Sequence, residues 1–238
     1  MQRIYLENLK SDEEQIILTQ ADILHQLIKV LRVRLGEKIC FFNGQDSTDY
    51  LFEITELEKR KIICNKLQEE SNNSESNISL HLYNSFPNKL EKIEYILQKG
   101  TEVGFTEFHF FHSERSQKLN LSENKIIRLE KIIIEAVEQS GRSIVPQLFF
   151  HDHLDFSDFK NQNNVFFHTQ NNKSKGLRDL NLTTENNINL FVGPEGGFSE
   201  EEVIGFEDHN FYRIHLGNRI LRTETTGMVT GFFILQNI

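Results

Sequence analysis

The chain has 238 residues, which is enough for one large domain or two smaller ones. Apolar residues make up 38% and charged residues 26%, as in an ordinary globular protein. No apolar run approaches the roughly 20 residues that span a bilayer, and residues 1–10 are too polar for a signal peptide. We therefore expect a cytoplasmic protein with no membrane segment. The formal net charge of −9 argues mildly against a nucleic-acid partner, but phosphate binding needs only a local basic patch.

The cysteine pattern predicts no metal site. Cys40 and Cys64 belong to no CxxC pair, and each lies in an apolar, strand-like run. Reduced thiols in a protein core are the simplest interpretation of both.

The first part of the chain favours strands, with one helix among them. Residues 39–42 and 50–54 flank a turn-rich stretch that contains the pair Asn43-Gly44, and residues 61–67 form another strand candidate. The helix is predicted to begin after Thr19 as its cap, with apolar residues at helical spacing between Ile23 and Leu31. A short, strand-rich module with one helix suggests a small β-barrel.

One segment of this acidic chain is locally basic. Residues 21–40 contain Lys29, Arg32, Arg34 and Lys38. A basic cluster at the end of a helix is usually a solvated face, and a contact with nucleic acid is the alternative.

Residues 69–77, EESNNSESN, contain no apolar residue and cannot bury themselves. We interpret this stretch as a linker between a domain at residues 1–70 and a second domain at residues 78–238.

After the linker, strand-like and helical stretches alternate. The strand candidates are residues 78–83, 106–111, 165–168, 188–192 and 211–215. The helical stretches are residues 88–102, 122–139, 199–206 and 223–235. This alternation predicts an α/β domain with a parallel sheet covered on both faces, whose binding sites lie at the carboxyl ends of the strands.

The sharpest motif is VGPEGGF at residues 192–198, directly after an apolar strand. Its glycines allow a ligand to approach the main chain closely, and Ser199 with Glu202 forms a capping box for the next helix. A tight strand-to-helix turn is the plain alternative. The motif is neither a P-loop nor GxGxxG, so a classical dinucleotide-binding loop is not supported.

A second motif, LGNRILRTET at residues 216–225, also joins a strand to a helix. A helix start accounts for Thr223 and Glu224, but it leaves Arg219 and Arg222 unexplained at the wrong helix end. Two further polar clusters lie at element ends, around residues 99–116 and residues 135–146. Glycine-terminated helices explain their glycines.

Taken together and in order, QKGTEVG, HSERS, EAVEQSGRSIVP, VGPEGGFSEEE and LGNRILRTET resemble the ribosomal RNA small subunit methyltransferase E family. HQLIKVLRVRLGEKICFFNG resembles the same family, in which it lies in a PUA-like barrel. The resemblance implies a SPOUT-type α/β domain with a C-terminal trefoil knot. It also implies S-adenosylmethionine as cofactor and methylation of the ring nitrogen at position 3 of a uridine in 16S rRNA. Thr226 departs from the family, which usually has alanine there.

By the same resemblance, the cofactor lies in a cleft formed by the loops that follow three strands. The implied cofactor-binding residues are Phe167, His168, Thr169, Val192, Gly193, Pro194, Glu195, Gly196, Leu216, Gly217, Ile220, Leu221 and Thr223. Arg222 is the candidate cation that stabilises the anionic uracil ring, and Glu224 is either a base or only a helix-start carboxylate.

Contacts to RNA are expected from Arg32, Arg34, Arg115 and Arg142. The partners implied are 16S rRNA in the small ribosomal subunit and a second copy of the chain in a homodimer. Two alternatives remain open: another SPOUT RNA methyltransferase, acting on a ribose or another base, and a non-catalytic RNA-binding assembly protein.

Overall fold

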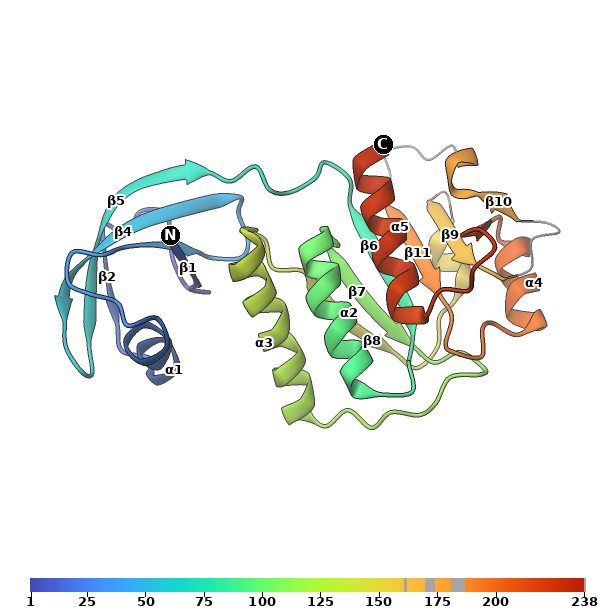
Figure 1. The fold of residues 1–238 in the computed structure, drawn as a ribbon, viewed down its shortest axis with the longest axis horizontal. Helices are drawn as coiled ribbons and strands as arrows, with labels where there is room; N and C mark the ends of the chain where they lie inside the picture. Colours follow the sequence, from blue (N-terminus) through green and yellow to red (C-terminus); the bar gives the residue numbers. More distant parts are fainter. Residues whose placement is uncertain (161, 170–173, 181–186, 238) are drawn as a thin grey trace. The chain divides into compact units, whose positions relative to one another are not determined.

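The computed structural model describes residues 1–160, 162–169, 174–180 and 187–237 (Figure 1). Its chain divides into two compact units. The first contains Met1–Glu75 and Val137–Val145, and the second contains Ser76–Ala136 and Pro146–Ile238. The predicted boundaries assign residues 137–145 to the second domain, whereas these residues cluster with the first unit.

The first unit contains a five-stranded sheet in the order β1-β3-β4-β5-β2. Its strands are β1 (Gln2–Tyr5), β2 (Gln15–Leu18), β3 (Lys38–Phe42), β4 (Thr48–Leu57) and β5 (Ile62–Ser71). β1 runs parallel to β3, and the other pairs are antiparallel. Fully buried side chains such as Ile39, Phe41 and Phe52 form its core.

The helix of this unit begins later than predicted. α1 (Ala21–His25) is preceded by Gln20 as the N-cap residue, which makes no side-chain capping hydrogen bond, so the predicted cap at Thr19 is wrong. The helix continues as the π-helix η1 (Gln26–Leu31) and ends at Arg32, which adopts a left-handed backbone conformation with φ 55°. The apolar residues at helical spacing do face the core at two positions, since Leu24 and Leu27 are buried.

The polar stretch at residues 69–77 is more structured than a free linker. β5 extends to Ser71, because strand pairing uses backbone groups and needs no apolar side chain. Beyond it, the Asn72 amide donates to Asp49 Oδ2 at 3.0 Å and to the Gly141 carbonyl at 2.9 Å. Glu75 pairs with Arg142, whose Nη2 lies 2.7 Å from Glu75 Oε2.

The second unit has a seven-stranded sheet in the order β10-β12-β9-β11-β6-β7-β8, and every described pairing is parallel. The strands are β6 (Leu80–Ser85), β7 (Glu107–Phe111), β8 (Gln147–His151), β9 (Asn163–Phe167), β10 (Lys175–Gly176), β11 (Ile188–Val192) and β12 (Tyr212–His215). The predicted α/β class is confirmed. β8 is absent from the predicted strands, because its sequence, QLFFH, shows no clear alternation of polar and apolar residues.

Helices cover both faces of this sheet, as Figure 1 shows. The helices are α2 (Leu90–Val103), α3 (Glu123–Ser140), α4 (Glu200–Asp208), α5 (Thr223–Asn237) and the short 3-10 turns η2 (Phe156–Phe159) and η4 (Leu177–Asp179). α2 and α5 pack side by side over Leu80, Leu82 and Phe108. On the other face, Phe206 of α4 and Phe159 of η2 pack in an aromatic cluster around Phe191.

Within the described part of the chain, no helix is both long and apolar enough to cross a membrane. The trefoil knot that the resemblance implies stays a prediction.

The close packing of α5 on its neighbours depends on a glycine. A Cβ atom built on Gly231 would lie 2.6 Å from Phe105 Cζ and 3.2 Å from Leu80 Cδ2. Contacts this short force core side chains to move, which typically costs about 1–3 kcal/mol.

Gly231→Val should therefore lower the free energy of unfolding in urea by about 1–3 kcal/mol. Val229→Ala, at an exposed position on the same helix, is the control and should change it by no more than about 0.5 kcal/mol. Equal and small effects from both variants would show that α5 does not approach Phe105 this closely.

Candidate active site

A pocket of about 370 Å³ lies at the carboxyl ends of β9, β11 and β12. The loops after these strands, with the start of α5 and one residue of α2, supply its lining. The lining residues are Lys92, Phe167, His168, Thr169, Val192, Gly193, Pro194, Glu195, Gly197, Ile214, His215, Leu216, Gly217, Asn218, Arg219, Ile220, Leu221, Arg222, Thr223 and Thr226. Parallel strands bring their carboxyl ends to one edge of the sheet, so segments distant in sequence meet here.

The loop after β11 is rich in glycine and leads into a capped helix, α4. Gly197 has φ 68°, a conformation that favours glycine. The predicted capping box is confirmed: Glu202 N donates to Ser199 Oγ at 3.2 Å, and Ser199 N donates to Glu202 Oε2 at 2.8 Å. A Cβ on Gly193 would lie 3.3 Å from Phe198 N, so a side chain there would press on this loop itself.

A hydrogen bond fastens the loop after β11 to the start of α5. The Thr223 hydroxyl donates to the Gly193 carbonyl at 2.8 Å, and Thr223 is buried. The Asn84 amide lies 3.5 Å from the same hydroxyl. Thr223 therefore positions two walls of the pocket relative to each other.

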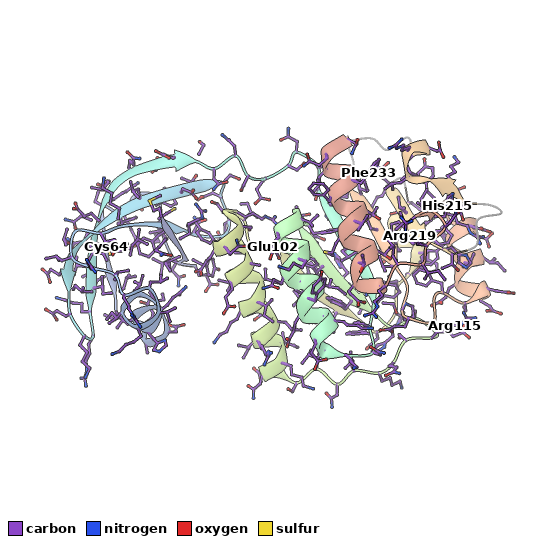
Figure 2. All side chains as sticks on the ribbon, viewed as in Figure 1. Cys64, Glu102, Arg115, His215, Arg219 and Phe233 are labelled. Atoms are coloured by element: carbon purple, nitrogen blue, oxygen red, sulfur yellow. The ribbon has the colours of Figure 1, made fainter. Side chains whose placement is uncertain are left out.

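The loop between β12 and α5 forms the outer wall. Gly217 has φ 87°, and the side chain of Ile220 is 82% exposed although it is large and apolar. Figure 2 labels Arg219 of this loop and His215, which ends β12 directly before it. An apolar side chain left this open at a pocket wall can cover an apolar part of a ligand.

Charged side chains of both signs lie close together near the start of α5. Lys92 Nζ lies 2.5 Å from Glu195 Oε1 and 3.9 Å from Glu224 Oε2. Arg222 Nη1 lies 3.9 Å from Glu224 Oε1, while its side chain is 83% exposed. Among the described residues, Glu224 Oε2 is buried without a hydrogen-bond partner. A buried carboxylate oxygen without a hydrogen-bond partner is uncommon and calls for an explanation, because buried polar groups are normally hydrogen-bonded.

Their surroundings shift the pKa values of two residues in the lining, Glu195 and His168. Burial alone would raise the pKa of Glu195, but bonds from Lys92 and from backbone amides bring it below its ordinary value. Burial and the nearby charge of Arg213 lower the pKa of His168. Arg213 Nη2 lies 3.0 Å from His168 Nδ1, which fits a neutral ring that accepts this hydrogen bond.

The hydroxyl of Thr226, where the family usually has alanine, is accommodated within α5. Thr226 Oγ1 donates to the Arg222 carbonyl at 3.0 Å. A buried hydroxyl with this partner carries little cost.

The pocket gathers nearly all of the predicted cofactor residues, together with Arg222. Gly196 is not among the lining residues; its carbonyl accepts a hydrogen bond from Arg115 at 3.1 Å. Glu224 does not line the pocket either, although it follows the lining residue Thr223.

The four arginines predicted to contact RNA have different surroundings. Arg32 and Arg34 are exposed in the first unit. Arg115 is exposed but its guanidinium is bonded to the carbonyls of Gly196 and Phe198. Arg142 is only 3% exposed and makes hydrogen bonds to both carboxylate oxygens of Glu75. This burial argues against the predicted contact between Arg142 and an RNA phosphate.

Sequence reasoning missed several lining residues, and Lys92 is the most informative of them. It lies on α2, 103 residues before Glu195 of the glycine motif, and no local pattern marks it. Asn218 and Arg219 could have been included, because they lie within LGNRILRTET.

Comparisons with known proteins agree with this architecture. A family model described as an RNA methyltransferase domain matches residues 74–234, and one described as an RNA methyltransferase PUA domain matches residues 18–67. A PUA domain followed by an RNA methyltransferase domain defines the class of this protein, an RNA methyltransferase.

The relatives are more specific. Ribosomal RNA small subunit methyltransferase E of Buchnera aphidicola subsp. Acyrthosiphon pisum is 32% identical over 95% of this chain and 90% of its own length. The Bacillus subtilis protein of the same name is 30% identical, over 94% of this chain and 92% of its own length. The chain therefore belongs to the ribosomal RNA small subunit methyltransferase E family.

Among solved structures, the Neisseria gonorrhoeae methyltransferase E bound to S-adenosyl methionine superposes with a TM-score of 0.88 at 28% identity, covering 99% of this chain and 97% of its own. A Legionella pneumophila putative methyltransferase in complex with the same cofactor gives a TM-score of 0.84 at 28% identity, with 98% and 96% covered.

The hydrogen bond between Thr223 and Gly193 generates a prediction about stability. Thr223→Val keeps the side-chain shape but leaves the Gly193 carbonyl without its donor, so the free energy of unfolding should fall by about 1–2 kcal/mol. The matched change Thr225→Val, at a half-buried position on the same turn, should change it by no more than about 0.5 kcal/mol. A Thr223→Val protein as stable as the parent would remove this hydrogen bond as a brace of the pocket.

Proposed function

We propose that this chain binds S-adenosylmethionine in the pocket at the ends of β9, β11 and β12, and methylates the ring nitrogen at position 3 of a uridine in 16S rRNA. The observation that carries the proposal is the pocket itself. It lies where a parallel sheet places its ligands, and it gathers both sequence motifs. Two structures with the same fold, each 28% identical to this chain, were solved with this cofactor bound.

The residues present fit such a cofactor. The pocket volume of about 370 Å³ lies in the range of small-molecule sites. The exposed backbone from Leu216 to Leu221, together with Gly193, offers donors and acceptors to the polar parts of the ligand. Ile220 offers an apolar surface, 82% exposed, to a flat base. When bound, S-adenosylmethionine would supply a methyl group made electrophilic by its sulfonium.

The chain's own part in the chemistry is alignment and charge. The uracil nitrogen carries a proton at neutral pH and attacks poorly until that proton leaves. Glu224 Oε2, buried and without a hydrogen-bond partner among the described residues, is the proposed proton acceptor. The exposed guanidinium of Arg222 is the proposed cation for the oxygens of the deprotonated ring.

RNA is proposed to contact the first unit through Arg32 and Arg34. Both side chains are exposed and follow the helical segment that ends at Leu31. The left-handed backbone of Arg32 fixes the direction in which the chain leaves that helix. Basic side chains of this kind position a nucleic acid through its phosphates.

A homodimer is the remaining part of the proposal. α5 leaves Val229 and Phe232 exposed, and an apolar helix face of this kind suits a second copy of the chain.

Ile220→Asp should weaken the binding of S-adenosylmethionine by about tenfold or more in calorimetry, because a charge replaces the apolar cover of the ligand. The fold should stay intact, since the side chain is already exposed. Ile204→Asp, an exposed position on α4, is the matched control and should leave the affinity unchanged. Unchanged affinity in both variants would mean that this wall does not contact the cofactor. Gly193 is a poorer test, because a side chain there also strains the loop.

Arg222→Ala should slow single-turnover methylation at saturating substrates by about a hundredfold, while cofactor affinity changes little. The side chain is exposed, so the fold should survive. Without this cation the uracil is harder to ionise, and the rate of the variant should keep rising to higher pH than that of the parent. Arg222→Lys should recover part of the rate. A parent-like rate and pH profile for Arg222→Ala would exclude a catalytic role.

Exchanging both Arg32 and Arg34 for Glu should weaken RNA binding and flatten its dependence on salt, because fewer phosphates are neutralised. Affinity for S-adenosylmethionine should be unchanged. The matched control exchanges Lys59 and Arg60, which are exposed in the turn between β4 and β5, for Glu. If both double variants show the parent's salt slope, this segment does not contact RNA.

A further inference from the structure

A second pocket of about 360 Å³ lies on the same sheet and shares no lining residue with the first. Polar side chains dominate it, and four of them are histidines. Its lining residues are His81, Tyr83, Glu107, His109, His151, His153, Leu154, Asp155, Asp158, Phe159, Gln162 and Asn187. The proposed methylation uses none of them.

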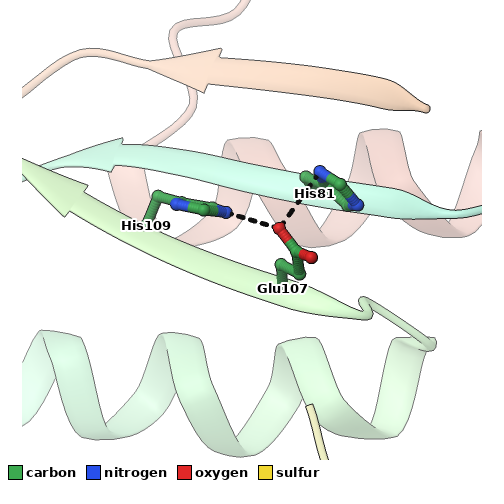
Figure 3. Close-up of side chains that lie close together, drawn as sticks. All are labelled: His81, Glu107 and His109. Atoms are coloured by element: carbon green, nitrogen blue, oxygen red, sulfur yellow. Dashed lines mark hydrogen bonds and ion pairs between the residues drawn. The ribbon is translucent and has the colours of Figure 1, made fainter. Parts of the chain in front are cut away.

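At its inner end, one carboxylate oxygen faces two histidine rings, as Figure 3 shows. Glu107 Oε2 lies 2.8 Å from His109 Nε2 and 3.3 Å from His81 Nδ1. The ligand atoms of these three residues all lie within 4.8 Å of one another. Strand register explains the cluster: His81 of β6 pairs with Glu107 of β7, and Glu107 and His109 share one face of β7.

In each ring, the nitrogen that faces away from Glu107 already has a hydrogen-bond partner. His109 Nδ1 lies 3.0 Å from His151 Nε2, and His81 Nε2 lies 2.9 Å from Ser79 Oγ. Ser79 Oγ in turn lies 3.2 Å from Thr106 Oγ1. Histidines that ligate a metal commonly use one nitrogen for the ion and hold the other in such a hydrogen bond, which fixes the ring.

Burial lowers the pKa of both histidine rings. Burial, with a smaller contribution from His151, lowers the pKa of His109 to about 3. Burial also lowers the pKa of His81, against the opposing charge of Glu107.

We propose that His81, Glu107 and His109 bind a divalent transition-metal cation of the Zn²⁺ class, with its remaining coordination position open to the second pocket. Two imidazole nitrogens and one carboxylate oxygen are a common zinc ligand set. Ligand atoms around a tetrahedral zinc ion lie about 3.3–3.5 Å apart. The separations of Glu107 Oε2 from His109 Nε2, 2.8 Å, and from His81 Nδ1, 3.3 Å, lie near this spacing. Glu107 is partly exposed, and Asp155 and Asp158 at the pocket wall attract cations toward it.

The proposed site departs from the prediction, made from the cysteine pattern, that the chain has no metal site. The three ligands come from two neighbouring strands, so they do not form one of the short spacings that mark a zinc motif. Since the two pockets share no residue, the ion would stabilise the β6–β7 pair rather than take part in methyl transfer.

The test is a calorimetric titration of the full chain, freed of metal by a chelator, with Zn²⁺ alone. One Zn²⁺ should bind per chain, and the thermal unfolding temperature should rise with Zn²⁺ concentration. Mg²⁺ should do neither, because it prefers an all-oxygen shell. Glu107→Gln keeps the side-chain size and should weaken Zn²⁺ binding by about a hundredfold or more, since even outer partners are commonly worth 10–100-fold. His25→Ala, at an exposed histidine in the first unit, is the control and should bind as the parent does.

Nuclear magnetic resonance of the parent chain keeps the proposal testable if Glu107→Gln does not fold. Zn²⁺ should shift the ring signals of His81 and His109 at one equivalent and leave those of His25 unchanged. The proposal is overturned if the parent binds no Zn²⁺, if Glu107→Gln binds it as tightly as the parent, or if the signals of His81 and His109 do not move.

Discussion

The parallel alignment of β9, β11 and β12 is the constraint on which the proposed active site depends. Because these strands pair in register, their carboxyl ends lie at one edge of the sheet. Three neighbouring loops therefore follow Phe167, Val192 and His215, the last residues of the strands. A slip of one residue in any pairing would turn a strand over and move its loop. The buried residues of β11, all five of them fully inside the protein, specify that register strongly.

Hydrogen bonds around the pocket hold the loops that follow these strands in place. Thr223 ties α5 to the end of β11, and the capping box at Ser199 fixes where α4 begins. Arg115 holds the outer part of the same glycine loop through two carbonyls. The glycine loop is thus held at both ends, while the loop from Gly217 to Ile220 is exposed. A site with one fixed wall and one open wall suits a bound small molecule that must also meet a large RNA.

The distribution of charge reconciles an acidic chain with an RNA substrate. The net charge of −9 is an average over the whole surface, and it says little about the residues that would meet RNA. Arg222 is almost fully exposed at the pocket, and Arg32 and Arg34 are exposed in the first unit. Arg142, by contrast, is buried in a salt bridge with Glu75. The number of arginines in a motif is therefore less informative than which of them stay open to solvent.

The sequence by itself determined the fold class, the capping box and the two loops of the pocket. These depend on local patterns: apolar alternation, a glycine run after a strand, and a serine three residues before a glutamate. Only the tertiary structure decided which distant residues meet. Lys92 joins the pocket from α2, residues 137–145 cluster with the first unit, and Glu107 comes between His81 and His109 through strand register. No local spacing encodes such contacts, because they arise when strands and helices far apart in sequence pack against one another.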